Sequence, residues 1–115
     1  MTDDLVLKTT LEVVDAKKGD HPVILDLRGI SILTDYFLVV GGLNTTHVRT
    51  IADAIKDRLE ESGIQPQRIE GYKEGRWVLL DYSHLVIHIL AQEERDFYRL
   101  EELWHEAKVI EPSLA

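Results

Sequence analysis

Apolar side chains that recur every three or four residues predict three helices in this chain. An aspartate at position 3 or 4 can cap the first helix, and Gly19 is expected to end it. The second helix begins after the capping side chains of residues 44–46 and closes at Gly63. The third helix is predicted over 93–108. Its apolar positions are Phe97, Leu100, Leu103, Trp104 and Ala107.

Shorter apolar runs, bounded by turn residues, predict the strands of a sheet. The first run covers 23–27. The second, 36–40, is apolar without alternation, which is typical of a central strand buried on both faces of an α/β sheet. The polar stretch 65–70 contains Pro66 and suits only an edge strand. With a hairpin after it, the order is helix, strand, strand, helix, three strands and a helix. This order predicts one α/β domain with a mixed sheet flanked by helices.

The segments 77–82 and 85–90 are expected to form that hairpin, with Ser83-His84 as a two-residue turn. In this register one face is wholly apolar: Val78, Leu80, Tyr82, Leu85, Ile87 and Ile89. The other face is mixed: Trp77, Leu79, Asp81, Val86, His88 and Leu90. Two-residue turns normally contain Gly or Asn, so Ser83-His84 fits poorly. A longer loop would shift the register by one residue and exchange the two faces.

The composition is that of a small globular protein. A length of 115 residues suits one domain, which we expect to span 1–110, with 111–115 as a flexible tail. The hydrophobic content of 44% is sufficient for a core. No apolar run is long enough to span a bilayer, and the acidic start does not resemble a signal peptide. The absence of cysteine excludes disulfides and thiolate metal ligands. These features favour a cytoplasmic location.

The net charge of −8 arises from 13 basic and 21 acidic side chains. A protein that holds nucleic acid through its phosphates needs clustered Lys and Arg. Here the basic side chains are spread along the chain, so we expect no primary contact with nucleic acid and favour a basic protein as partner. On composition alone, however, solubility is the better explanation of the charge.

The Gly41-Gly42 pair lies between a predicted strand and a predicted helix, where backbone amides can approach a phosphate. The nucleotidyltransferase fold opens in a similar way, but its enzymes need two carboxylates one residue apart on the following strand to hold magnesium. No such pair follows on an apolar strand, and the nearest strand acid is Asp81. We therefore interpret the glycines as a requirement of the turn rather than as a catalytic loop.

Two side chains on the mixed face of the hairpin have more than one interpretation. His88 and Asp81 lie diagonally across this face and could form a catalytic dyad, but no nucleophile with an orienting group accompanies them. A structural or contact role for His88 is favoured.

Trp77 is equally compatible with the core and with an interface anchor, whereas Trp104 is expected in the core. His47 and Arg49 oppose the dipole of the second helix, at a cost small enough to be tolerated.

Five motifs follow one another in a fixed order from about the first helix to Trp104. They are Asp26-Leu27-Arg28-Gly29 with Leu33-Thr34-Asp35-Tyr36-Phe37, then Glu70-Gly71, then Trp77 to Tyr82, then Val86 to Ile89, then Phe97 to Glu101 with Leu103-Trp104. In this order they resemble the Iojap/RsfS family of ribosomal silencing factors. The chain departs from the family at Ser83, where members often have Gly, and at Leu90-Ala91, where a bulky aromatic often occurs.

The resemblance implies a nucleotidyltransferase-like fold without catalytic acids, enzymatic activity, cofactor or metal. It also implies binding to large-subunit ribosomal protein fourteen at the subunit interface. Such binding blocks association with the small subunit and lowers translation when nutrients are scarce. Members commonly form homodimers away from the ribosome. Carried over by motif, the candidates for the binding surface are Trp77, Asp81, His88 and Tyr98. Weaker candidates, by proximity in sequence to these residues, are Tyr82, Arg99 and Glu101.

Two other functions stay open at this point. One is a minimal nucleotidyltransferase that uses Asp81 with a second acid brought in by the fold. The other is a dimeric adaptor with a target outside the ribosome.

Overall fold

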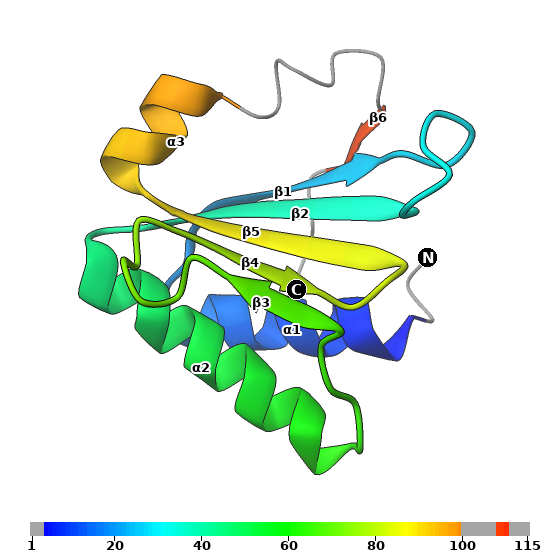
Figure 1. Ribbon diagram of the computed structural model, residues 1–115, viewed down its shortest axis with the longest axis horizontal. Helices are drawn as coiled ribbons and strands as arrows, with labels where there is room; N and C mark the ends of the chain where they lie inside the picture. The colour runs from blue at the N-terminus through cyan, green and yellow to red at the C-terminus, as the bar shows by residue number, and fades with distance from the viewer. Residues whose placement is uncertain (1–3, 100–107, 111–115) are drawn as a thin grey trace.

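A mixed sheet organises the part of the chain that the structure, a computed structural model, describes: residues 4–99 and 108–110 (Figure 1). The elements are α1 (Leu5–Ala16), β1 (Asp20–Asp26), β2 (Tyr36–Gly42), α2 (Thr45–Glu61), β3 (Arg68–Glu70), β4 (Trp77–Asp81), β5 (Leu85–Ala91), α3 (Gln92–Tyr98) and β6 (Lys108–Ile110). The six described strands are ordered β3-β4-β5-β2-β1-β6. Within this sheet β2 and β5 run parallel, and every other neighbouring pair is antiparallel. The predicted α/β fold is confirmed.

The helices α1 and α2 lie side by side on one face of the sheet (Figure 1). The cap of α1 is Asp4, whose Oδ1 accepts hydrogen bonds from the backbone N–H groups of Val6 and Leu7. Its other oxygen, Oδ2, lies 2.7 Å from Nε2 of His84, which ties the start of α1 to the β4–β5 turn. The apolar stripe of α2 is buried completely at Val48, Ile51, Ala52, Ile55 and Leu59. This face therefore carries the main core.

The end of α1 differs slightly from the prediction. The helix stops at Ala16, and Lys18 rather than Gly19 takes the left-handed conformation, with φ 60°. Gly19 is needed for another reason. A Cβ atom there would lie 2.7 Å from Val14 Cγ1 and 2.7 Å from Val40 Cγ2, too close for any side chain. The glycine allows the chain to pass between α1 and the sheet.

The predicted hairpin register is confirmed. Trp77 pairs with Leu90 and Asp81 pairs with Val86, so Ser83-His84 forms the connection. All six residues of the predicted apolar face belong to the main core. The turn is unusual: Ser83 has a φ of 75°, and the His84 N–H donates to the Tyr82 carbonyl. A hydrogen bond between residues i and i+2, with a positive φ at the residue between them, defines a γ-turn. This conformation is strained for a residue with a side chain and favours glycine.

The third predicted helix is too long. It ends at Tyr98, because Arg99 takes the left-handed conformation with φ 46°. The prediction placed Lys108 in this helix, but residues 108–110 form strand β6, antiparallel to β1. This pairing satisfies backbone groups of the β1 edge, a long-range requirement that a helical period does not reveal. The predicted apolar positions after Phe97 and the predicted tail 111–115 lie outside the described residues. No described helix is both long and apolar enough to cross a membrane.

Candidate functional site

A second, smaller apolar cluster lies on the sheet face opposite α1 and α2. Its buried members are Val23, Leu25, Leu27, Val39 and Leu90. Two partly buried aromatic side chains pack against it, Phe37 from β2 and Trp77 from β4. Strand alternation places His88 of β5 on the same face. This face of the sheet therefore carries a buried apolar cluster, two aromatic side chains and a histidine.

The side chains of Trp77 and His88 are joined by a hydrogen bond. The indole Nε1–H of Trp77 donates to Nδ1 of His88 over 3.1 Å, with ring centroids 5.9 Å apart. Phe37 contacts the same imidazole edge to face, with a centroid distance of 4.5 Å and an interplanar angle of 68°. Trp77 and His88 are diagonal neighbours across β4 and β5, which is within reach of long side chains. The prediction that they share a face is thus refined to a direct contact.

His88 is nearly inaccessible, with 5% of its surface exposed. Burial lowers the pKa of its imidazole to about 4, because the charged form would lose its hydration. The ring is therefore neutral near pH 7. Since Nδ1 accepts a hydrogen bond, the proton is on Nε2. Among the described residues this buried Nε2 has no hydrogen-bond partner.

Asp81 forms other contacts than those of a dyad. Its Oδ2 accepts from Arg68 Nε over 3.2 Å, and its Oδ1 accepts from the Ser83 N–H over 2.8 Å. The hydrogen bond of His88 goes to Trp77 instead. Asp81 therefore forms an ion pair with Arg68 at the end of β4, beside the turn. These contacts disfavour both the catalytic dyad and the metal-holding acid considered from the sequence. The described residues contain no group of three or more metal-ligating side chains.

The remaining predicted site residues are Tyr82, Tyr98, Arg99 and Glu101. Tyr82 lies on the opposite face, in the main core, with 6% of its surface exposed. Burial raises the pKa of its hydroxyl to about 12. Tyr98 is the last residue of α3, and Arg99, which follows it, is exposed. Glu101 lies outside the described residues. Tyr82 is therefore a core residue of the described structure, on the face away from Trp77.

Gly42, the second residue of the glycine pair, has a packing role. A Cβ atom on Gly42 would lie 2.7 Å from Val48 Cγ2 and 3.1 Å from the Val48 nitrogen. The close approach of α2 to β2 therefore requires glycine, whether or not a phosphate binds there.

In the first turn of α2, His47 Nδ1 accepts from the Leu43 N–H, and its Nε2 lies 2.8 Å from the Lys17 carbonyl oxygen. This bridge to the end of α1 explains why a histidine is tolerated there.

A contact of Arg28 with Asp26 and with the Tyr36 ring was not predicted from the sequence. Arg28 binds Asp26 with two side-chain hydrogen bonds, of 3.0 and 2.8 Å. The guanidinium lies 5.2 Å from the centre of the Tyr36 ring. Its bond to Asp26 raises the pKa of Arg28. The two-residue spacing of Asp26 and Arg28 was the available signal, since such a spacing after a strand allows a local ion pair.

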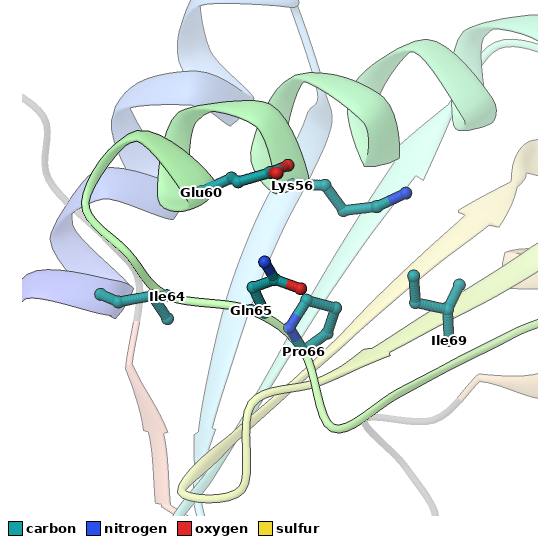
Figure 2. A pocket seen from close by; sticks show the side chains of 6 residues that line it. All are labelled: Lys56, Glu60, Ile64, Gln65, Pro66 and Ile69. Carbon is teal, nitrogen blue, oxygen red and sulfur yellow. The ribbon is translucent and has the colours of Figure 1, made fainter.

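A pocket of about 280 Å³ lies between α2 and β3, on the helical side of the sheet. Figure 2 shows its lining side chains coming from α2, from the connection after it and from β3. They are Lys56, Glu60, Ile64, Gln65, Pro66 and Ile69. The pocket contains none of the predicted site residues. The Trp77 face is therefore the better candidate for function.

Comparisons with known proteins agree with the fold and with the motifs. The family described as "Ribosomal silencing factor during starvation" (RsfS) matches residues 2–115. Ribosomal silencing factor RsfS of Bacillus subtilis is 40% identical over 107 residues, 93% of this chain and 91% of the relative. A crystal structure of a protein from Chromobacterium violaceum has a TM-score of 0.85 at 30% identity, over 100% of this chain and 93% of that one.

A more distant relative is the mouse protein named Mitochondrial assembly of ribosomal large subunit protein 1. It is 30% identical over 74 residues, which is 62% of this chain and 32% of the mouse protein. The motifs, the fold and the match along almost the whole length agree, and they show that this chain belongs to the RsfS family of ribosomal silencing factors.

Proposed function

We propose that this chain binds the large ribosomal subunit through the sheet face that carries Trp77, and that the bound protein keeps the small subunit from joining. Family membership supports a role in silencing ribosomes. The observation that carries the choice of face is the position of Trp77, a partly buried aromatic ring at the margin of an apolar cluster. Aromatic side chains in such positions dominate the energetics of protein interfaces.

The proposed contact on the large subunit is ribosomal protein fourteen at the subunit interface. The mouse relative's name refers to the large subunit, which favours that subunit over the small one. The net charge of −8 favours a basic protein surface and disfavours close contact with rRNA phosphates. Away from the ribosome, the protein is proposed to form a homodimer, which size-exclusion chromatography with light scattering would test.

The mechanism is steric and requires no catalysis. The two features that raised the possibility of phosphoryl transfer have structural roles. Gly42 is required by the approach of α2, and the carboxylate of Asp81 is bound by Arg68 and by the Ser83 N–H. Silencing then depends only on occupancy, and it should follow the fraction of large subunits that carry the protein. Translation would be repressed in this way under nutrient limitation or in stationary phase.

Sedimentation with separated ribosomal subunits tests the proposal. Wild-type protein is expected to sediment with large subunits and to reduce their association with small subunits. Trp77→Ala should weaken binding by roughly 30-fold or more, the effect of removing a hot-spot aromatic. Tyr72→Ala is the matched control, because Tyr72 is also a partly exposed aromatic but bonds to Asp53 of α2.

Both variants must keep a cooperative thermal transition above the assay temperature. If folded Trp77→Ala protein binds large subunits as tightly as wild type, the assigned face is wrong. If wild-type protein sediments with neither subunit, the ribosomal role itself fails.

A further inference from the structure

We propose that His88 is a positioning residue, which holds the indole of Trp77 in its binding orientation without itself forming the contact surface. This inference rests on the proposed function, since it assigns a role within the same site. It separates two residues that motif likeness places together as binding residues. Trp77 is the group that meets the partner, and His88 is the group that fixes it.

The burial of His88 indicates that this side chain does not itself form the contact surface. With 5% of its surface exposed, the side chain offers almost no area to a partner. Two aromatic side chains from adjacent strands contact its ring. Trp77 of β4 bonds to Nδ1, and Phe37 of β2 contacts the ring at 4.5 Å between centroids. Truncation of His88 would therefore act on binding through Trp77.

The hydrogen bond from Trp77 Nε1 to His88 Nδ1 supports the assignment of His88 as the residue that orients the indole. An indole ring attached through two rotatable bonds can swing out of the sheet face, and ordering it at an interface costs free energy. The 3.1 Å bond from Nε1 fixes the ring before binding. Only a neutral imidazole with an unprotonated Nδ1 can accept this bond, because Trp Nε1 is a donor only. Burial of His88 favours that neutral form.

The bond also defines what Trp77 offers to its partner. The single donor of the indole is already directed at His88, so the ring contributes carbon edges and a π face. Such a surface suits aliphatic side chains, or the Lys and Arg side chains of a basic protein through cation–π contact. A partner group that needs a hydrogen-bond donor would gain nothing from Trp77.

Two substitutions of equal shape test the inference. His88→Asn places a carbonyl oxygen near the position of Nδ1 and keeps the acceptor. His88→Leu has the same branching and removes it. We expect His88→Asn to bind large subunits within about twofold of wild type, and His88→Leu to bind roughly two- to tenfold more weakly. The indole N–H resonance of Trp77, assigned with Trp77→Phe, should exchange faster with solvent in His88→Leu alone.

The outcomes separate this inference from the proposed function. If Trp77→Ala weakens binding but His88→Leu and His88→Asn bind equally, the positioning role is wrong and the binding face stands. If Trp77→Ala has no effect, the proposed face is wrong, whatever His88 does. If His88→Leu weakens binding while the Trp77 indole resonance is unchanged, His88 acts by another route and the inference is overturned.

Discussion

At the scale of single residues, strand alternation places Trp77 and His88 on one face, and this much was predictable from the sequence. Their hydrogen bond was not, because it depends on rotamers and on contact with Phe37 from a strand far away in the chain. Tyr82 shows the opposite case. Its neighbour Asp81 suggested a surface role, whereas alternation alone would have assigned it to the core, where it lies.

The buried imidazole of His88 makes stability depend on pH. Its pKa is about 4 in the folded protein and about 6.5 in an unfolded chain. The unfolded chain therefore takes up the proton first as the pH falls, and the free energy of unfolding decreases between about pH 6.5 and pH 4. From pH 7 to pH 5 the loss from this residue is about 2 kcal/mol.

Urea unfolding at both pH values measures this loss. The reference is His88→Asn, which has no titrating group at this position but retains every other ionisable side chain. Wild type should lose about 2 kcal/mol more than this variant between pH 7 and pH 5. Equal losses in the two proteins would show that the imidazole is not held in its neutral form by burial.

At the scale of elements, apolar patterns predicted most of the helices and strands because burial determined them. The hairpin register followed from the requirement that six apolar side chains face α1 and α2. Two features lacked such a local signal. The end of α3 depends on the left-handed conformation of Arg99, and β6 exists through pairing with β1, more than eighty residues earlier in the chain.

The γ-turn between β4 and β5 is a local defect that a substitution can relieve. Ser83 holds a φ of 75°, where a side chain is strained and glycine is not. Ser83→Gly should therefore raise the free energy of unfolding by about 0.5–1 kcal/mol, after the greater freedom of glycine in the unfolded chain is subtracted. Chemical denaturation of the two proteins measures the difference.

Ser62→Gly is the matched control for this turn. Ser62 follows α2 with a φ of −96°, which serine adopts without strain. The same substitution there should leave stability unchanged or lower it slightly. A gain of equal size at both positions would mean that the effect does not come from the conformation of the turn.

At the scale of the whole molecule, the negative net charge is expected to affect the rate of association with the proposed partner. The apolar face around Trp77 is expected to affect the lifetime of the complex. The excess of acidic over basic side chains is expected to attract the proposed basic partner over a distance that salt shortens. The proposed contact of the Trp77 ring with that partner is expected to be much less sensitive to salt. Long-range attraction is thus expected to set how often the partners meet, and Trp77 how long they stay together.

Binding to large subunits should accordingly weaken when salt rises from about 0.1 M to about 0.3 M. The ratio between wild type and Trp77→Ala should stay nearly constant over this range. Sedimentation titrations of both proteins at the two salt concentrations provide the measurement. An affinity that does not change with salt would show that electrostatic attraction does not contribute to the choice of partner.

The strand order also has a consequence for how the chain folds during synthesis. The parallel β2–β5 pair joins two antiparallel units, β1–β2 and β3–β4–β5, across a separation of nearly fifty residues. Non-local pairings of this kind form slowly. Until residue 91 has been synthesised, the first unit lacks the neighbour of its central strand, and β1 keeps an open edge until residues 108–110 follow. The sheet of the described residues is thus completed only after its last strand, β6, has been synthesised.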